Sequence, residues 1–293
     1  MIALAQPGVD GILGSPDIIE DLLLLDALHD KIVIGSMNRG GLSGATWEID
    51  DAFTGYDAES IEAMNLDGGK MLLRLVYDDP GTLETIKASA NAITALARRK
   101  RLAMLEVLPA SRDANGVLTI SKNPDAMIKA IGVGSALGVS SAYTWLKIHV
   151  VEEMERVMCA TTLPTLLLGG DPGVRAAELF AGWRRALAIP QVRGLVAGRA
   201  LLFPAHGDGV RAVSAAAESV PGPCPAPGVR PRLRPRRAQP PRPGRALELK
   251  QTKHHGPVRG DSSPRTARSS SRRSTRARAG RGAPRDQRRA GGS

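Results

Sequence analysis

The sequence has few of the residues that mark disulfide-rich, metal-binding or membrane-spanning proteins. Its two cysteines, Cys159 and Cys224, are too few for a disulfide framework, and no spacing of Cys and His resembles a zinc site. His29, His149 and His206 are scattered without a partner at ligand or triad spacing, so we assign them no function. No apolar run approaches the ~20 residues that cross a bilayer, and the N-terminus lacks the basic and apolar regions of a signal peptide. These absences predict a cytoplasmic protein with no metal, no cofactor and no membrane contact.

The positive charge of the chain is confined to one end. The formal net charge is +11, but residues 221–293 alone hold 20 Lys and Arg against 3 Asp and Glu, which makes +17. The other 20 basic and 26 acidic residues leave residues 1–220 with a charge of −6. A mildly acidic body is ordinary for a soluble enzyme, so the basic pI does not indicate that residues 1–220 bind nucleic acid.

The composition changes within a few residues after Val220. Pro, Arg, Gly, Ala and Ser dominate residues 221–293, and apolar periodicity vanishes. Such a segment cannot bury enough apolar surface to offset its ordering entropy. We therefore expect one globular domain over residues 1–220 and a disordered basic tail over 221–293. The tail is either a genuine basic arm or the product of translation in a shifted reading frame.

Short apolar runs alternate with helical patterns along residues 1–220, which is typical of parallel βα units. Ser15-Pro16, Asp79-Pro80 and Asn123-Pro124 are helix starts in which a capping residue precedes proline. Together these patterns predict an α/β fold of the TIM (β/α)8 barrel class. The seven predicted strands are residues 9–14, 31–36, 70–77, 102–108, 143–150, 165–170 and 194–199.

Seven βα units are one fewer than a parallel barrel needs to close its sheet. The last two predicted strands end in glycine motifs of the kind that bind phosphate after strands 7 and 8 of such barrels. If they are strands 7 and 8, the absent unit is the first one, and the segment MIALAQ is the remnant of its helix. We therefore expect an N-terminally truncated barrel.

Lys147 interrupts the apolar strand YTWLKIHV near its C-terminal end, where barrel enzymes place catalytic groups. Burial disfavours an ammonium, so such a lysine is a candidate free amine that attacks a carbonyl. Because side chains alternate along a strand, Lys70, Arg74 and Glu106 are candidates to share the barrel interior with it. A second cation would then favour the free amine, and Glu106 would relay protons. The alternative is a structural role for each residue, as an interior ion pair or as a lysine that snorkels to the strand end.

Glycine ends the last two predicted strands, in Gly169-Gly170 and in Gly198-Arg199. Glycine lets backbone N–H groups approach an anion closely, and the start of the following helix adds a favourable dipole. Either motif alone is also typical of a simple turn. Two such motifs just downstream of the lysine strand together indicate a phosphate site.

Ser36, Asn38 and Arg39 end the second predicted strand, where polar groups can meet substrate hydroxyls. A turn with local caps explains these residues equally well. The loop over residues 38–55 is rich in glycine and longer than the usual βα connection, which makes it a candidate lid.

Three segments of the chain carry a resemblance to a known superfamily, namely TWLKIHVVEEMERV, ATTLPTLLLGGDP and VRGLVAGRALLFP. They resemble class I aldolases, a superfamily that includes tagatose-bisphosphate, archaeal-type fructose-bisphosphate and deoxyribose-phosphate aldolases. With VIGSMNRGG and FTGYDAE, the chain is more similar to an actinobacterial branch of aldolase-like (β/α)8 barrels, over about residues 7–215. Relatives carry a first strand with an acidic residue, typically within Asp-His-Pro, and the present sequence starts after it.

The resemblance implies a role for each candidate residue. Lys147 matches the Schiff-base lysine, and Glu106 and Lys70 match polar residues of the two preceding strands. The residues that match phosphate-binding positions are Gly169, Gly170, Gly198 and Arg199. Arg74, Ser36 and Asn38 complete the predicted substrate contacts. The implied activity is a lyase that forms or cleaves a C–C bond of a phosphorylated sugar through a lysine imine, on a scaffold that can assemble as a homo-oligomer.

Two other functions stay open at this stage. A catalytically inactive or truncated barrel that acts as a remnant or a binding protein fits the same scaffold, because a fold does not determine function. A nucleic-acid binder that acts through the tail would show strongly salt-dependent DNA affinity that disappears with residues 221–293.

Overall fold

The structure is a computed structural model that describes residues 1–42, 50–169, 176–204 and 208–220. The chain divides by its internal contacts into two units, Met1–Ala238 and Gln239–Ser293. The predicted tail over residues 221–293 lies outside the described residues. Within the described ranges, no helix has the length and apolar character needed to cross a membrane.

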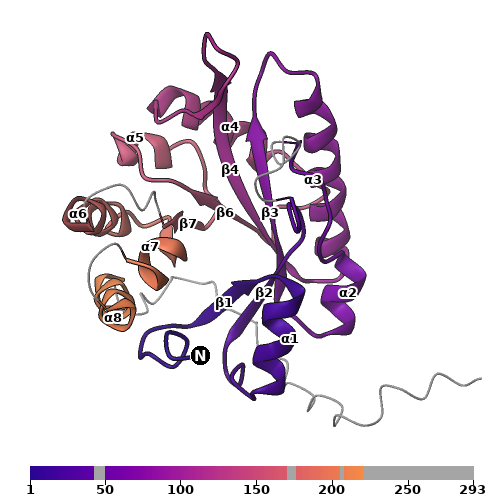
Figure 1. Ribbon diagram of the computed structural model, residues 1–293. Coiled ribbons are helices and arrows are strands. Elements are labelled where there is room, and N and C mark those ends of the chain that lie inside the picture. The colour runs from indigo at the N-terminus through magenta and orange to yellow at the C-terminus, as the bar shows by residue number, and fades with distance from the viewer. Residues whose placement is uncertain (43–49, 170–175, 205–207, 221–293) are drawn as a thin grey trace, which may run out of the picture. The chain divides into compact units, whose positions relative to one another are not determined.

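Seven parallel strands form one sheet in the order β1-β2-β3-β4-β6-β7-β8 (Figure 1). Each strand pairs with the next parallel strand along the chain, as in a TIM-type barrel. All seven predicted strands are confirmed, with small shifts of their ends. The bounds are β1 (Gly11–Gly14), β2 (Ile32–Ser36), β3 (Gly68–Leu75), β4 (Leu102–Arg112), β6 (Thr144–Ile148), β7 (Thr165–Leu168) and β8 (Val192–Val196).

The helices follow the strands as the (β/α)8 pattern requires. Asn123 caps its helix as predicted, since its side chain accepts hydrogen bonds from the N–H groups of the next turn. The prediction of Ser15 as a side-chain cap is wrong, because its hydroxyl donates to the carboxylate of Asp17 instead of accepting from the backbone. The helices are α1 (Pro16–Leu24), α2 (Ala58–Ala63), α3 (Gly81–Arg98), α4 (Pro124–Ser135), α5 (Met154–Met158), α6 (Ala176–Leu187), α7 (Arg199–Leu202) and α8 (Gly209–Ser219).

Strands β1 and β8 are the two edges of the sheet, and the described residues place no strand between them. Helix α8 lies against the N-terminal segment on this side. The Ser214 hydroxyl donates to Gln6 Oε1 over 3.2 Å, and a Cβ atom on Gly8 would lie 3.1 Å from the Cβ of Ala217.

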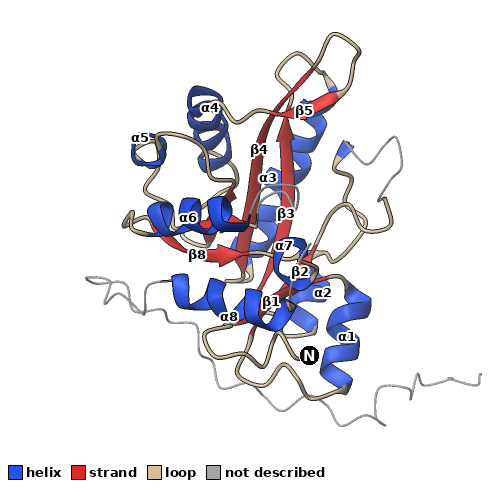
Figure 2. Cartoon of the chain, turned by 60° about the vertical axis from the view of Figure 1, so that its left-hand side comes forward, coloured by secondary structure: helices blue, strands red, loops and turns tan. Residues whose placement is uncertain are grey.

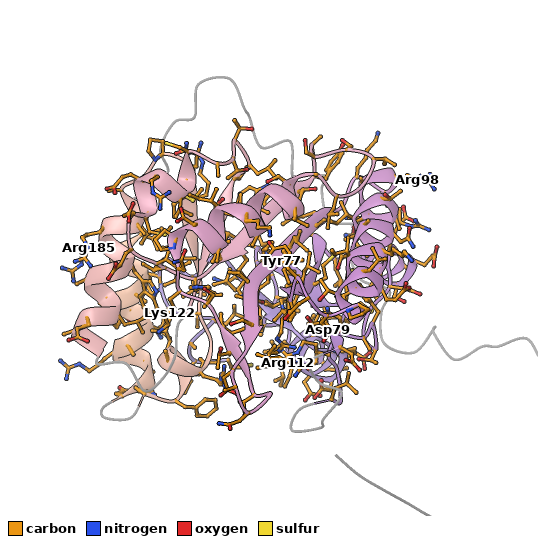
Figure 3. All side chains as sticks on the ribbon, turned by 90° about the horizontal axis from the view of Figure 1, so that it is seen from above. Tyr77, Asp79, Arg98, Arg112, Lys122 and Arg185 are labelled. Atoms are coloured by element: carbon orange, nitrogen blue, oxygen red, sulfur yellow. The ribbon has the colours of Figure 1, made fainter. Side chains whose placement is uncertain are left out.

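Strand β4 continues past its parallel neighbours into a hairpin that the sequence did not predict (Figure 2). Its last residues pair antiparallel with β5 (Leu118–Ile120), and Asp113 closes the turn by accepting from two backbone N–H groups. Arg112 of this hairpin lies 3.1 Å from Asp79 of the β3–α3 loop (Figure 3). The hairpin therefore ties the carboxyl end of β4 to that of β3.

The alternation of side chains along β4 and β6 separates the helix layer from the barrel interior. A Cβ atom on Gly134 of α4 would lie 2.9 Å from Val107, 3.2 Å from Leu105 and 3.9 Å from Leu146, so these residues face the helices. Glu106 and Lys147 occupy the alternate positions of the same strands and therefore face inward.

Candidate active site

Three charged side chains from adjacent strands meet inside the barrel. Lys147 Nζ on β6 lies 3.0 Å from Glu106 Oε2 on β4, and Lys70 Nζ on β3 lies 2.8 Å from the same oxygen. Each of the three side chains is about 9 or 10% exposed. The strand register explains the meeting, because Glu106 pairs directly with Lys147 across the β4–β6 ladder. The structure thus brings together the three residues predicted to be catalytic.

The two lysines change the acidity of the carboxyl group between them. Burial alone would raise the pKa of Glu106, but the ammonium groups of Lys70 and Lys147 hold that pKa well below its usual range. Burial lowers the pKa of Lys70, and the positive charges of Lys147 and Arg39 lower it further against the attraction of Glu106. Lys70 therefore releases its proton more readily than a solvated lysine.

A second cluster of charged side chains connects the loop after β2 with strand β3. Arg74 Nη1 donates to Asp51 Oδ1 over 2.7 Å, and the Arg74 backbone N–H donates to the other Asp51 oxygen over 2.9 Å. Arg39 Nε lies 3.6 Å from Asp51 Oδ1. Burial raises the pKa of Asp51 to about 6, against the opposing effect of both guanidinium groups. The pKa of Arg39 is lowered by burial and by the positive charges of Arg74 and Arg199, against Asp51 and Glu106.

Asn38 makes three hydrogen bonds that extend the pairing of β2 and β3. Its amide nitrogen donates to the backbone oxygens of Asp51 (3.1 Å) and Leu72 (2.7 Å), and its amide oxygen accepts from the Leu72 N–H (2.9 Å). The hydroxyl of Ser36 donates to the Asn38 carbonyl over 3.4 Å. Only the Ser36 bond is local, as in the turn that the sequence left open, whereas Asn38 bonds to β3. A substrate contact of either residue stays a prediction.

The glycines at the ends of β7 and β8 differ in their surroundings. A Cβ atom on Gly169 would lie 2.8 Å from both Cα and Cβ of Ala197, so this glycine permits a close approach of the two strands. Gly198 is exposed, and a Cβ atom there would meet nothing within 4 Å. Arg199 is exposed at the start of α7, and Gly170 lies outside the described residues.

Sequence reasoning missed two buried residues next to these groups. Asp51 is 1% exposed and has φ +50°, and neither its burial nor its partner Arg74 leaves a signal in the loop sequence. His149 is 8% exposed, and its Nε2 lies 3.1 Å from the backbone oxygen of Ser121. Its spacing of two residues from Lys147 was a usable signal, because residues i and i+2 of a strand share one face.

Comparison with known proteins places the chain in a family. The profile of a family described as Cgl0159-like matches residues 1–217. The crystal structure of Cgl0159 from Corynebacterium glutamicum is 49% identical, with a TM-score of 0.71 over 75% of this chain and 73% of that chain. Comparison with curated proteins gives no match.

Two crystal structures of archaeal fructose 1,6-bisphosphate aldolase share the fold at low sequence identity. One is 15% identical, with a TM-score of 0.57 over 75% of this chain and 81% of that chain. The other was solved with its catalytic Lys covalently bound to the carbinolamine intermediate of the substrate, and is 14% identical, with a TM-score of 0.56 over 73% of this chain and 79% of that chain. At these identities the likeness shows the TIM-type fold and no more.

Proposed function

We propose that this chain, which belongs to the Cgl0159-like family and has the barrel fold of class I aldolases, is a lyase that acts through an imine on Lys147. Its reaction is the formation or cleavage of a C–C bond in a phosphorylated sugar. One observation carries the proposal, namely the contact of Lys147 and Lys70 with a single buried oxygen of Glu106.

The attack on the substrate needs Lys147 as a free amine. Glu106 Oε2 contacts both lysine nitrogens and so offers a path for a proton from Lys147 to an unprotonated Lys70. The lowered pKa of Lys70 raises the share of Lys70 that is unprotonated and so able to accept this proton. The amine then adds to the carbonyl carbon of the substrate, and loss of water from the carbinolamine gives an iminium ion.

The iminium ion accepts the electron pair of the C–C bond that breaks. The bond between the α- and β-carbons opens, the β-hydroxyl loses its proton, and an aldehyde leaves while the α-carbon becomes part of an enamine on Lys147. Protonation of the enamine carbon restores the iminium ion, and addition of water releases the ketone product and the free amine. Every atom of this cycle comes from the substrate, water or the lysine.

Lys70, Glu106 and Lys147 form the proposed catalytic trio, and positive charge near them supports an anionic substrate. The charges of Arg74 and Arg199 both act on Arg39, which itself acts on Lys70. We assign the phosphate group to the ends of β7 and β8, at the predicted residues Gly169, Gly170, Gly198 and Arg199, because glycine lets backbone N–H groups approach an anion and arginine adds positive charge. Arg74, Ser36 and Asn38 are assigned to the sugar end of the substrate.

Borohydride trapping tests the proposed function. The protein is reduced in the presence of dihydroxyacetone phosphate, fructose 1,6-bisphosphate or 2-deoxyribose 5-phosphate, and the adduct is located by peptide mass spectrometry. We expect an adduct on Lys147 that is absent in Lys147→Ala and in Lys147→Arg, since a guanidinium stays protonated and does not form an imine. Lys87→Ala, which changes an exposed lysine in an ion pair with Glu84, is the control and keeps the adduct.

The trapping result also separates the enzyme from an inactive barrel. A protein that binds sugar phosphates without forming imines would bind the probes and give no adduct. Absence of a Lys147 adduct with all three probes, or equal labelling of Lys147 and Lys87, would therefore refute the proposed function.

A further inference from the structure

His149 lies one inward position beyond Lys147, toward the carboxyl ends of the strands. Both residues belong to the segment Lys147-Ile148-His149, in which Ile148 is fully buried and faces the other way. Lys147, the inward neighbour of His149 on this segment, contacts Glu106 over 3.0 Å, so the ring projects from the same face as the catalytic trio. His149 is therefore placed above the reactive amine on the same side of the sheet.

The hydrogen bond of His149 fixes where its proton sits. Nε2 lies 3.1 Å from the backbone oxygen of Ser121, and a carbonyl oxygen only accepts hydrogen bonds. Nε2 must therefore carry the hydrogen, which leaves Nδ1 of the neutral ring with a free lone pair. Ser121 is itself held in place, because its N–H donates to the oxygen of Pro109 on β4 over 2.8 Å.

Nδ1 of His149 is buried and has no hydrogen-bond partner among the described residues. A buried polar atom without a partner costs about 1–3 kcal/mol, so it calls for an explanation, and a ligand or a reaction is one. Burial also lowers the pKa of His149, with the positive charge of Lys122 acting in the same direction and Glu106 and the bond to Ser121 opposing it. The ring is therefore neutral at neutral pH, with the lone pair of Nδ1 available to accept a proton.

The C–C step needs a base other than the trio, because in the proposed reaction Lys70 already holds the proton taken from Lys147. Glu106 accepts hydrogen bonds from two ammonium groups and is held in its ionised form, which makes it a weak proton acceptor. Lys70 is engaged with the same carboxylate. Positions two residues apart on one face of a strand are separated by only about 7 Å along the backbone, so the imidazole and the reactive lysine project from neighbouring inward positions.

We propose that His149 is the acid–base catalyst of the C–C step, an inference that rests on the proposed function. Nδ1 takes the proton of the β-hydroxyl while the C–C bond breaks and the electron pair passes to the iminium nitrogen. The resulting imidazolium returns this proton to the enamine carbon after the aldehyde has left, and the ring is neutral again. The Ser121 carbonyl holds the ring and stabilises the charged form.

The experiment uses dihydroxyacetone phosphate and compares imine formation with proton transfer in the full chain. Imine formation is measured by borohydride trapping, and proton transfer by the exchange of the α-hydrogen of the probe with D₂O in NMR spectra. His149→Gln keeps a donor for the Ser121 carbonyl and lacks the basic nitrogen. His29→Gln changes an exposed histidine and is the matched control.

We expect His149→Gln to give the Lys147 adduct at the level of the unmodified protein and to lose exchange by about 10²-fold or more, with no change in His29→Gln. The exchange rate of the unmodified protein should also fall as the pH drops through the lowered pKa of His149, and the variant should lack this limb. Exchange within about threefold of the unmodified protein, or loss of the adduct together with exchange, would overturn the assignment of His149. Absence of the adduct in the unmodified protein would instead refute the proposed function.

Discussion

Replacement of Glu106 by glutamine tests how strongly the buried carboxylate holds the two lysines. The folded chain keeps the pKa of Glu106 at about 2, against an ordinary value of 4.5. Because each pKa unit corresponds to about 1.4 kcal/mol, the ionised carboxylate contributes about 3 kcal/mol to the free energy of unfolding at neutral pH. This agrees with the cost of about 3–5 kcal/mol for removing one partner of a buried ion pair.

The lowered pKa of Glu106 determines how its contribution to stability changes with pH. Glu106 binds its proton less tightly in the folded chain than in the unfolded chain, so its contribution is complete above pH 4.5 and is lost as the pH falls toward 2. We expect Glu106→Gln to lower the free energy of unfolding by about 3 kcal/mol at pH 7 and by progressively less below pH 4.5.

Urea unfolding followed by circular dichroism measures both effects. Glu84→Gln is the control, because Glu84 is an exposed partner of Lys87 and exposed pairs contribute at most about 1 kcal/mol. If Glu106→Gln and Glu84→Gln have the same midpoint at pH 7, the buried trio does not depend on the charge of Glu106 and the reasoning fails.

Two further substitutions test the packing around the site by urea unfolding. Gly169→Ala should cost about 1–3 kcal/mol, because its Cβ atom would lie 2.8 Å from Ala197, whereas Gly198→Ala has open space and should change stability by less than about 0.5 kcal/mol. Equal midpoints for the two alanine variants would show that the strand ends move apart freely. Asn38→Leu leaves backbone groups of β3 unpaired and should cost about 2–4 kcal/mol, while Ser36→Ala removes one bond of 3.4 Å and should cost under about 1 kcal/mol. A stable Asn38→Leu would show that water replaces the amide.

The interior face of the strands was predictable because strand side chains alternate with a period of two residues. That period placed Lys70, Glu106 and Lys147 on inward positions of three strands, and in the structure both lysine nitrogens lie within 3.0 Å of one Glu106 oxygen. The apolar runs also gave all seven parallel strands, since such runs are typical of strands covered on both faces. The pattern of residues within a single strand was therefore sufficient to predict where the strands lie and which of their side chains face inward.

The contacts between distant segments were not predictable in this way. Asn38 bonds to a backbone 34 residues away, and its role depends on where β3 lies. Strand β5 of the β4–β5 hairpin has only three residues, which are too few to show an alternation in the sequence. Asp51 pairs with Arg74, 23 residues further along the chain, and the loop sequence alone does not predict this contact.

The close approach of β7 to β8 bears on how the protein can change its preferred ligand. At Gly169 the neighbouring strand leaves room for a hydrogen atom only. A larger residue at this end of β7 and β8 would therefore disturb the packing of the two strands. The loop after β2 instead carries Arg39, a long side chain that lies 3.6 Å from Asp51 and whose replacement creates no backbone clash of this kind. Under the proposed function, substitutions at Gly169 would therefore cost stability, and mutational libraries aimed at altered selectivity belong at Arg39 and its neighbours.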